Sequence, residues 1–349
     1  MIKRLLSILL LLTMTLTLFT GCQKPNEKFQ KSNFYFDTII SITVYEEEQQ
    51  TYIDDCFKMA SYYEKLFSAT IADSDISRIN ANAGSFVEVQ EETISLIQKA
   101  LEFGALSDGL FTISIGSLSK LWNISERIKT LDENRIADAS YLPSDEAIQE
   151  RLSHIGDSLI EIKDHQVRLI DSKASIDLGG IAKGYIADQM KAYLVEKGVS
   201  SGIINLGGNV LTLSEKPDGS LYSIGIQKPF SATGESIGII KVADKSVVSS
   251  GNYERYFMVN NKLYHHILNP KTGYPVENEL YEVTIISDSS LDGDALSTTC
   301  FALGLEDGMK LIESLDGVEA LFITNDYKIY TSSGIDKEIS FKKKYHLKK

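Results

Sequence analysis

The chain has 349 residues, 43% of them hydrophobic, which is enough for one large domain or two closely packed ones. Its 35 Lys and Arg residues against 48 Asp and Glu residues give a formal net charge of −13. This acidic balance argues against a nucleic-acid partner, because neutralising phosphates requires an excess of basic side chains.

The N-terminus has the three parts of a bacterial export signal. MIKR is basic, LLSILLLLTMTLTLF is apolar, and the small residues Thr20-Gly21 stand before Cys22. The apolar run is short for a helix that stays in the membrane. A cysteine at this place is the feature of a lipoprotein signal, so we expect residues 1–21 to be removed and Cys22 to be acylated, which anchors the protein at the extracytoplasmic face of the cell membrane. An ordinary signal peptide with an incidental cysteine is the alternative. Residues 22–33 then form a polar tether.

The patterns that follow mix strands and helices. In the first half we expect a strand at 34–45, a helix at 51–67, a turn at 74–80 and a helix at 91–107, then a turn entering an apolar stretch at 107–123 and a polar surface segment at 124–150 with a helix from Ser144. A hairpin at 167–180 and a helix at 181–197 follow, and then two strands around a double glycine at 202–213. The last part should contain strands at 222–227, 236–242, 254–260 and 281–287, a helix at 293–303 and a β-rich end. No regular βαβ alternation is present. The expected fold class is therefore α+β, with mixed sheets and packed helices in one catalytic unit over 34–340 and a basic tail at 341–349.

Two cysteines besides Cys22 lie in apolar surroundings. Cys56 falls on the apolar face of the helix expected at 51–67, and Cys300 falls within the helix expected at 293–303. Both are expected to be buried thiols, and a disulfide between them stays open.

The segment IDLGGIAKGYIAD (176–188) places a double glycine directly before a helix. Such a turn exposes backbone N–H groups at the positive end of the helix dipole, which suits a phosphate. Lys183 lies in the first helical turn, where a cation is unfavourable unless an anion is near. The spacing fits neither a Walker loop nor GxGxxG. Phosphate binding and a purely structural tight turn therefore both remain open.

The segment DGDALSTTCFALG (292–304) begins with acids and continues as a helix. Asp294 and Thr298 are four residues apart and therefore share one helical face. A carboxylate and a hydroxyl on one face could hold Mg²⁺, which takes oxygen ligands. Helix capping by Asp292 or Asp294 is the structural alternative.

Two of the five histidines stand together in HHILNPKTGYP (265–275), before a loop rich in turn formers. Histidine exchanges a proton near neutral pH, so a pair at a rigid loop indicates that one of them is functional. The stretch SSGN (249–252) before it predicts a turn, or a loop whose hydroxyls and amides face a ligand. The double glycine of NLGGN (205–209) is most simply a structural turn.

Taken in order, these motifs resemble the ApbE family of FAD:protein FMN transferases. The resemblance rests on IDLGGIAKGYIAD, INLGGN, SSGNYERY, HHILNPKTGYP and DALSTT, with SDISRIN (74–80) and SDGLF (107–111) fitting the family's N-terminal half. It implies a T-fold-related architecture and a Mg²⁺-dependent reaction. In that reaction FMN passes from FAD to a Thr or Ser hydroxyl of an extracytoplasmic electron-transfer flavoprotein, and AMP leaves.

The resemblance also implies roles for individual residues. Asp294 and Thr298 would bind Mg²⁺ through their side chains and Gly180 through its carbonyl, while Asp177 and Lys183 would contact FAD. The flavin pocket would be lined by Phe36, Thr70, Leu110, Phe111, Thr112 and Ile267. His266 is the candidate general base, with His265 and the segment 269–273 supporting it.

Some positions depart from the family's usual residues. Phe36 stands for Met, Asp37 for Gly, Thr112 for Asp and Asn269 for the loop Asp, and Thr70 takes the place of an aromatic residue. These changes lie near the flavin, so a FAD pyrophosphatase that passes FMN to water remains an alternative. A lipoprotein that only binds FAD is a third reading, against which the intact Lys183, Asp294 and Thr298 argue.

Overall fold

The computed structural model describes residues 27–335, 339–341 and 347–348. The expected signal peptide, Cys22 and most of the basic tail lie outside these residues. The first strand begins at Phe29, so it takes in the end of the segment expected to be a tether.

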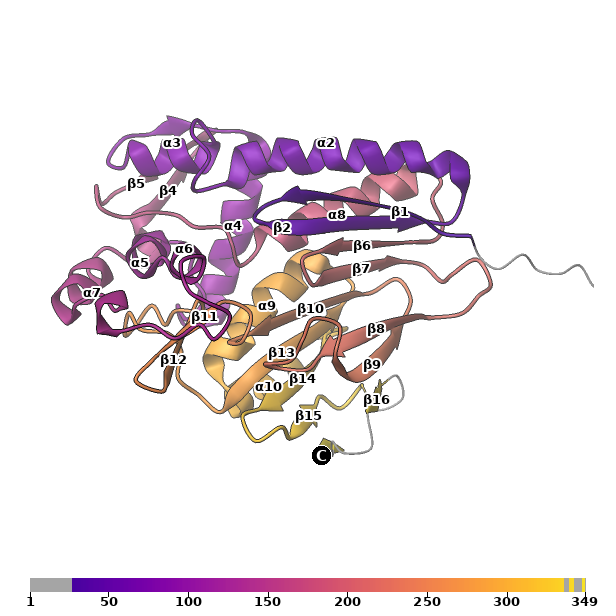
Figure 1. Cartoon of the computed structure of the whole chain (residues 1–349). Helices are drawn as coiled ribbons and strands as arrows, with labels where there is room; N and C mark the ends of the chain where they lie inside the picture. The colour runs from indigo at the N-terminus through magenta and orange to yellow at the C-terminus, as the bar shows by residue number, and fades with distance from the viewer. Residues whose placement is uncertain (1–26, 336–338, 342–346, 349) are drawn as a thin grey trace, which may run out of the picture.

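A large sheet forms the centre of the molecule (Figure 1). Within the described residues it has nine strands in the order β1-β2-β6-β7-β10-β13-β14-β15-β17. Their bounds are Phe29–Tyr35, Thr38–Val44, Gly202–Leu206, Asn209–Leu213, Ser246–Gly251, Leu280–Ser287, Glu319–Thr324, Ile329–Thr331 and Leu347–Lys348. Neighbouring strands are antiparallel except β15 and β17. This mixture of antiparallel sheets and packed helices confirms the α+β fold class.

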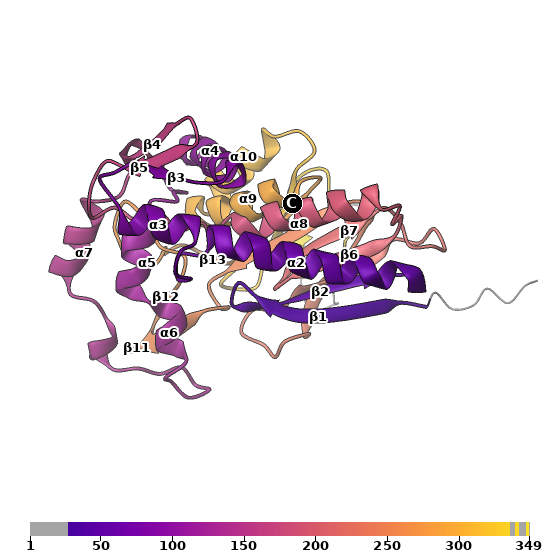
Figure 2. The ribbon, with the colours of Figure 1, turned by 90° about the horizontal axis from the view of Figure 1, so that it is seen from above.

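Four helices pack on one face of this sheet and enclose the main hydrophobic core (Figures 1 and 2). They are α2 (Gln50–Phe67), α8 (Ala182–Glu196), α9 (Ser290–Leu303) and α10 (Leu305–Glu313). The opposite face is covered in part by a sheet of β8 (Tyr222–Gln227), β9 (Ser236–Val242) and β16 (Ile339–Phe341), which closes a second core. The large sheet is therefore buried on both faces along β10, β13 and β14.

Two smaller units flank the helical side of the sheet. One contains α3 (Asp75–Ala81), α4 (Glu91–Leu106) and a sheet of β3 (Val87–Glu88), β5 (Gln166–Leu169) and β4 (Ile160–Lys163). The other contains α5 (Gly116–Trp122), α6 (Ile124–Ile128), α7 (Asp145–Leu152) and the hairpin of β11 (Tyr256–Val259) and β12 (Lys262–His265), around a core of its own. Short 3₁₀ turns lie at Glu47–Gln49, Ala139–Tyr141 and Asp157–Leu159.

Several elements differ from the sequence-based expectation. The strand expected at 34–45 is a hairpin, because Phe36 and Asp37 both have φ of 53°, and the N–H of Phe36 donates to Glu64 Oε1 at 2.6 Å. The turn expected at 74–80 is helix α3, whose N-terminus is capped by the Ser74 hydroxyl. The hairpin expected at 167–180 lies earlier, at 160–169, and the SSGN turn begins later, because β10 includes both serines.

The helices expected at 51–67, 91–107, 181–197 and 293–303 are all present, and Ser144 caps α7 as expected. Cys56 and Cys300 are free, buried thiols, so the alternative of a disulfide between them is wrong. Among the described residues, no helix is long and apolar enough to cross a membrane.

One carboxylate is buried within the large sheet. Glu282 of β13 has no exposed surface, and it accepts hydrogen bonds from the hydroxyls of Tyr253 at 2.6 Å and Thr284 at 2.9 Å. Burial raises the pKa of Glu282 to about 7, although these hydrogen bonds lower it. The folded chain therefore binds a proton that the unfolded chain releases near pH 4.3. The stabilisation from this proton is complete below the unfolded pKa and is lost as the pH rises through about 7.

We predict that Glu282→Gln, which cannot ionise, removes this pH dependence. Between pH 5 and pH 8.5 the free energy of unfolding of the variant should rise relative to wild type by about 2–3 kcal/mol. Urea unfolding at the two pH values measures the difference. Glu102→Gln, at an exposed carboxylate, is the control and should show no such change. An equal difference between Glu282→Gln and wild type at both pH values would contradict the prediction.

Candidate functional site

The N-termini of α8 and α9 meet on the helical side of the sheet. The two helices approach so closely at Gly184 that a Cβ there would lie 2.2 Å from the Ser290 carbonyl oxygen. The double glycine Gly179-Gly180 leads directly into α8. Each helix has the positive end of its dipole here, so this junction favours negative charge.

Asp294 is the charged centre of this junction. Its side chain is nearly fully buried, and Oδ2 accepts a hydrogen bond from the N–H of Gly184 at 2.9 Å. Its Oδ1 lies 3.3 Å from Lys183 Nζ. The structure thus brings together Lys183 and Asp294, which sequence analysis had singled out in motifs more than a hundred residues apart.

Thr298 lies one turn after Asp294, on the same side of α9. Its Oγ1 lies 3.3 Å from Ser250 Oγ, which is also 2.8 Å from Ser297 Oγ. A Cβ on Gly180 would be 3.8 Å from Thr298 Oγ1, so the Gly180 backbone passes beside this hydroxyl. Ser250 on β10 is a neighbour that sequence analysis did not assign to the site. The signal for it was the SSGN stretch, which was interpreted as a turn or as a loop whose hydroxyls and amides face a ligand.

The residues of this junction fit a Mg²⁺ ion by their chemistry. A carboxylate, a hydroxyl and a backbone carbonyl are hard oxygen donors, which Mg²⁺ takes together with water or phosphate oxygens. The described residues contain no group of three or more His, Cys, Asp or Glu side chains placed to hold a metal ion. A cation held by Asp294, Thr298 and Gly180 would therefore keep positions open for a ligand.

Asp177 and Phe111 shape the turn before α8. The Asp177 carboxylate accepts a hydrogen bond from the N–H of Gly179 at 2.9 Å, which fixes the double glycine. Phe111 is buried, and its ring edge would be 3.3 Å from a Cβ on Gly180. Both residues therefore lie beside the double glycine, and their contacts with FAD stay a prediction.

Thr112 faces a cavity that is separate from the α8–α9 junction. Its hydroxyl donates to Asp157 Oδ1 at 2.5 Å, and it lines a cavity of about 440 Å³ between α4 and the loop at Pro270 and Lys271. The lining of this cavity includes none of the predicted metal-binding residues. Burial raises the pKa of Asp157, and its hydrogen bond with Thr112 lowers it. Leu110, beside this segment, is half-buried.

Phe36 and Thr70 lie near the C-terminal end of α2. Phe36 stands at the tip of the β1–β2 hairpin, whose backbone is tied to Glu64 near the end of that helix. Thr70 follows the same helix, is exposed, and shares a 3.1 Å hydrogen bond with the Ser68 hydroxyl. No hydrogen bond in the described residues links either residue to Asp294, so their place in a flavin pocket stays a prediction.

The two histidines have different surroundings. His265 is buried, and its Nε2 donates to the Val276 carbonyl at 2.9 Å while its Nδ1 accepts from the N–H of Ile267 at 3.3 Å. Both ring nitrogens are therefore used to hold the loop, and burial lowers the pKa of His265 to about 4. Ile267, the predicted flavin contact, is itself buried in the main core.

His266 has a buried Nδ1 that has no hydrogen-bond partner among the described residues, although part of the side chain remains accessible. Its backbone N–H donates to the Arg255 carbonyl at 3.1 Å. Burial, followed by the positive charge of Arg255, lowers the pKa of His266 well below its usual value, and Lys183 contributes in the same direction. A hydrogen bond with the Arg255 backbone raises this pKa, but the net effect favours the neutral imidazole.

Glu254 is a second titratable group of the site that sequence analysis missed. Glu254 is exposed, and desolvation of its carboxyl by the surrounding protein raises the pKa. Lys183 and Arg255 lower this pKa, and Asp294 raises it. The signal lay in SSGNYERY, where Glu254 is the second residue after the predicted turn.

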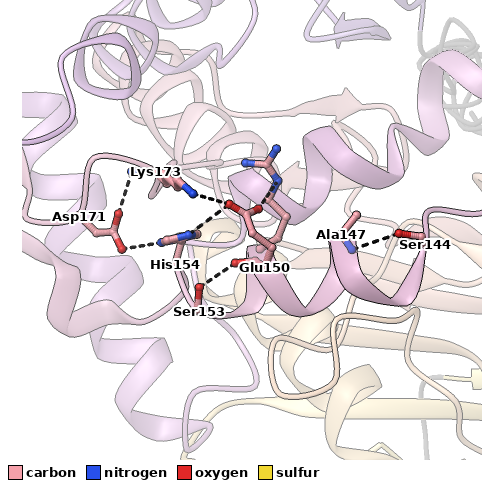
Figure 3. Close-up of polar contacts among 8 residues, drawn as sticks. Ser144, Ala147, Glu150, Ser153, His154, Asp171 and Lys173 are labelled. Carbon is pink, nitrogen blue, oxygen red and sulfur yellow. Dashed lines mark hydrogen bonds and ion pairs between the residues drawn. The ribbon is translucent and has the colours of Figure 1, made fainter.

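Helix α7 supports the histidine loop from outside. A Cβ on Gly273 would meet Ile148 at 2.4 Å, and the Tyr274 hydroxyl donates to Asp145, the first residue of α7. The far end of α7 is fixed by His154, whose Nδ1 lies 2.6 Å from Asp171 and whose Nε2 lies 3.5 Å from Glu150 (Figure 3). The loop is therefore packed against a helix that is itself anchored at both ends.

Comparisons with known proteins agree on one family. A profile of the ApbE family matches residues 36–322. A protein of Klebsiella pneumoniae (strain 342) named FAD:protein FMN transferase is 38% identical over 278 residues, covering 79% of this chain and 83% of the relative. A protein of the same name from Treponema pallidum (strain Nichols) is 31% identical over 328 residues, covering 88% of each chain.

Solved structures give the same result. The crystal structure of the ApbE protein from Thermotoga maritima has a TM-score of 0.79 at 30% identity, and the match covers 89% of this chain and 98% of that one. The flavin transferase ApbE from Vibrio cholerae has a TM-score of 0.77 at 25% identity, covering 90% of this chain and all of that one.

Proposed function

This chain belongs to the ApbE family, as its motifs predicted, and we propose that it transfers FMN from FAD to a Thr or Ser hydroxyl of an extracytoplasmic electron-transfer flavoprotein, with Mg²⁺ bound and AMP released. The names of the curated relatives support the transfer of FMN from FAD to a protein. The oxygen donors of the site support the metal ion, and the N-terminal sequence supports the location. The acceptor hydroxyl is what the resemblance to the family implies.

The junction of α8 and α9 is the observation that carries this proposal. The N-terminus of α8, a lysine and a glycine turn converge where a pyrophosphate would be bound, and a buried carboxylate of α9 stands beside them. Bound Mg²⁺ would neutralise negative charge on the phosphates. Asp294, Thr298 and the Gly180 carbonyl are the groups that would hold it, and Lys183 would place its ammonium near the phosphate oxygens.

The proposed transfer forms one bond and breaks one bond. A bond forms between the acceptor hydroxyl oxygen and the phosphorus of the FMN phosphate, and the bond from that phosphorus to the bridging oxygen of FAD breaks, so AMP leaves with that oxygen. The acceptor hydroxyl must lose its proton. His266 is the candidate because its surroundings favour the neutral ring and part of its side chain is accessible.

We predict that protein lacking residues 1–22, incubated with FAD, MgCl₂ and a small acceptor domain, adds one FMN moiety to that domain. Intact-mass spectrometry measures the gain, which should vanish with EDTA. Asp294→Ala should lower the rate by at least about 100-fold, because a buried charge that organises the site is removed. Asp292→Ala, two residues earlier on α9, is the matched control and should remain close to wild type, since its side chain makes no hydrogen bond with the site.

The same experiment distinguishes the other readings. Free FMN and AMP with no change in acceptor mass would favour the pyrophosphatase. Unchanged FAD would favour a protein that only binds it, and either result would overturn the transferase.

His266 gives a pH prediction. Because the pKa of His266 is lowered, its neutral base form persists at pH values below the usual histidine pKa. The fall of kcat/KM on the acid side of the pH profile should therefore lie below about pH 6.5. His266→Gln should slow transfer by about 100- to 10,000-fold without changing the mass of the product. A pH–rate profile from pH 5 to pH 9 measures the first effect. Full activity in His266→Gln, or an acid limb above pH 6.5, would count against His266 as the base.

We also propose that lipid on Cys22 anchors the protein outside the cytoplasm. The support is the sequence alone, namely the basic start, the apolar run and the small residues before Cys22. Cys22→Ala should move the full-length chain from the membrane fraction to the soluble or secreted fraction. Unchanged membrane recovery of this variant would argue for a different anchor.

A further inference from the structure

A second carboxylate joins α8 to α9 and has no part in the proposed chemistry. Asp188 of α8 accepts hydrogen bonds from the backbone N–H of Ser290 at 2.8 Å and of Leu291 at 2.9 Å, and its Oδ2 also lies 3.2 Å from the Ser289 hydroxyl. These N–H groups belong to the first turn of α9 and have no partner within that helix. Asp188 is thus a cap supplied to one helix by its neighbour.

The arrangement is reciprocal. Asp188 on α8 binds the first turn of α9, and Asp294 on α9 binds the N–H of Gly184 in the first turn of α8. Between these two contacts the helices touch at Gly184 and Ser290. Each helix N-terminus therefore carries a negative charge donated by the other, which complements both dipoles.

This pair of contacts fixes α9 along its own axis. Asp188 sets the position of residues 290 and 291, and Asp294 follows one turn later. Ser290 is further held by its hydroxyl, which donates to Asn209 Oδ1 at 2.7 Å. A slide of α9 would carry Asp294 and Thr298 away from Lys183 and Gly180. Metal and phosphate sites tolerate little displacement of this kind.

We propose that Asp188 is a positioning residue for the Mg²⁺ and pyrophosphate site, acting through the first turn of α9. The inference rests on the proposed function for the identity of the ligands, but its geometry concerns only described residues. Groups that orient metal ligands from behind affect metal affinity by about 10- to 100-fold when they are removed. An ordinary helix cap would instead contribute only to stability.

The test compares Asp188→Asn with a matched variant away from the junction. Asp75 is also a buried carboxylate at a helix N-terminus, where it accepts from the N–H of Gln90 at 2.9 Å and the hydroxyl of Thr93 at 2.7 Å at the start of α4. Asp75→Asn removes the same charge from a comparable cap. A general loss of stability should therefore affect both variants.

The first readout does not depend on turnover. ADP carries a pyrophosphate but no flavin, so the rise in melting temperature with MgCl₂ at fixed ADP reports formation of the metal–diphosphate site. We expect Asp188→Asn to need about 10- to 100-fold more Mg²⁺ than wild type for half of this rise, and Asp75→Asn to need the same as wild type. In the transfer assay kcat of Asp188→Asn at moderate MgCl₂ should fall, and raising MgCl₂ should restore part of it.

A second variant acts on the same contact from the other side. Gly184→Ala would place a methyl group 2.2 Å from the Ser290 carbonyl oxygen and must push the helices apart. It should show the same increase in Mg²⁺ requirement while leaving the Asp188 carboxylate in place.

The outcomes separate this inference from the proposed function. If Asp188→Asn only melts earlier, as Asp75→Asn does, and keeps the wild-type Mg²⁺ requirement, Asp188 is a structural cap and the inference is overturned. If wild type shows the Mg²⁺–ADP response and Asp188→Asn loses it, but wild type modifies no acceptor, the inference stands and the transferase proposal fails.

Discussion

The contact between the N-termini of α8 and α9 is the constraint on which the site depends. The two helices pass each other in opposite directions, so that Asp188 of α8 lies at the start of α9 and Asp294 of α9 lies at the start of α8. Each carboxylate complements the positive end of the other helix, and the close approach is possible because residue 184 has no side chain. An ammonium, a carboxylate and a hydroxyl are thereby brought together beside the glycine turn. These are the groups to which we assign the diphosphate and the divalent cation.

The rest of the fold holds this junction in place. The large sheet supports α8 and α9 from below through the main core, and β10 delivers Ser250 beside Thr298. The same strand leads into the turn with Glu254 and Arg255, and the carbonyl of Arg255 accepts the backbone N–H of His266. Strands far apart in sequence thus bring the base candidate and the metal-binding candidates to the same region.

The paired histidines divide two tasks that one residue could not perform. His265 uses both ring nitrogens within its own loop, so it has no free lone pair for a substrate. These hydrogen bonds fix the backbone on either side of His265, while Nδ1 of His266 has no hydrogen-bond partner among the described residues. A fixed loop also suits the role of general base that we propose for His266. The pair was noticeable in the sequence because the chain has few histidines. Only the structure showed that His265 uses both ring nitrogens in hydrogen bonds.

The sequence by itself determined the family, the α+β class, most helices and the residues of the α8–α9 junction, because these depend on local periodicity and on short ordered motifs. It also placed Asp294 and Thr298 on one helical face, since four-residue spacing is a property of the helix alone. What only the tertiary structure decided involves partners distant along the chain. The turn at Phe36-Asp37 has left-handed backbone angles but contains no glycine, so the sequence did not predict it. The structure shows the turn and the hydrogen bond with Glu64 that holds it. Thr112 points toward Asp157 and a separate cavity, and its partner lies in a distant segment of the chain. Asp188 caps α9 only because the fold places the two helices side by side. Hydrogen bonds between residues far apart along the chain produce no periodic pattern in the sequence, because no local structure requires them.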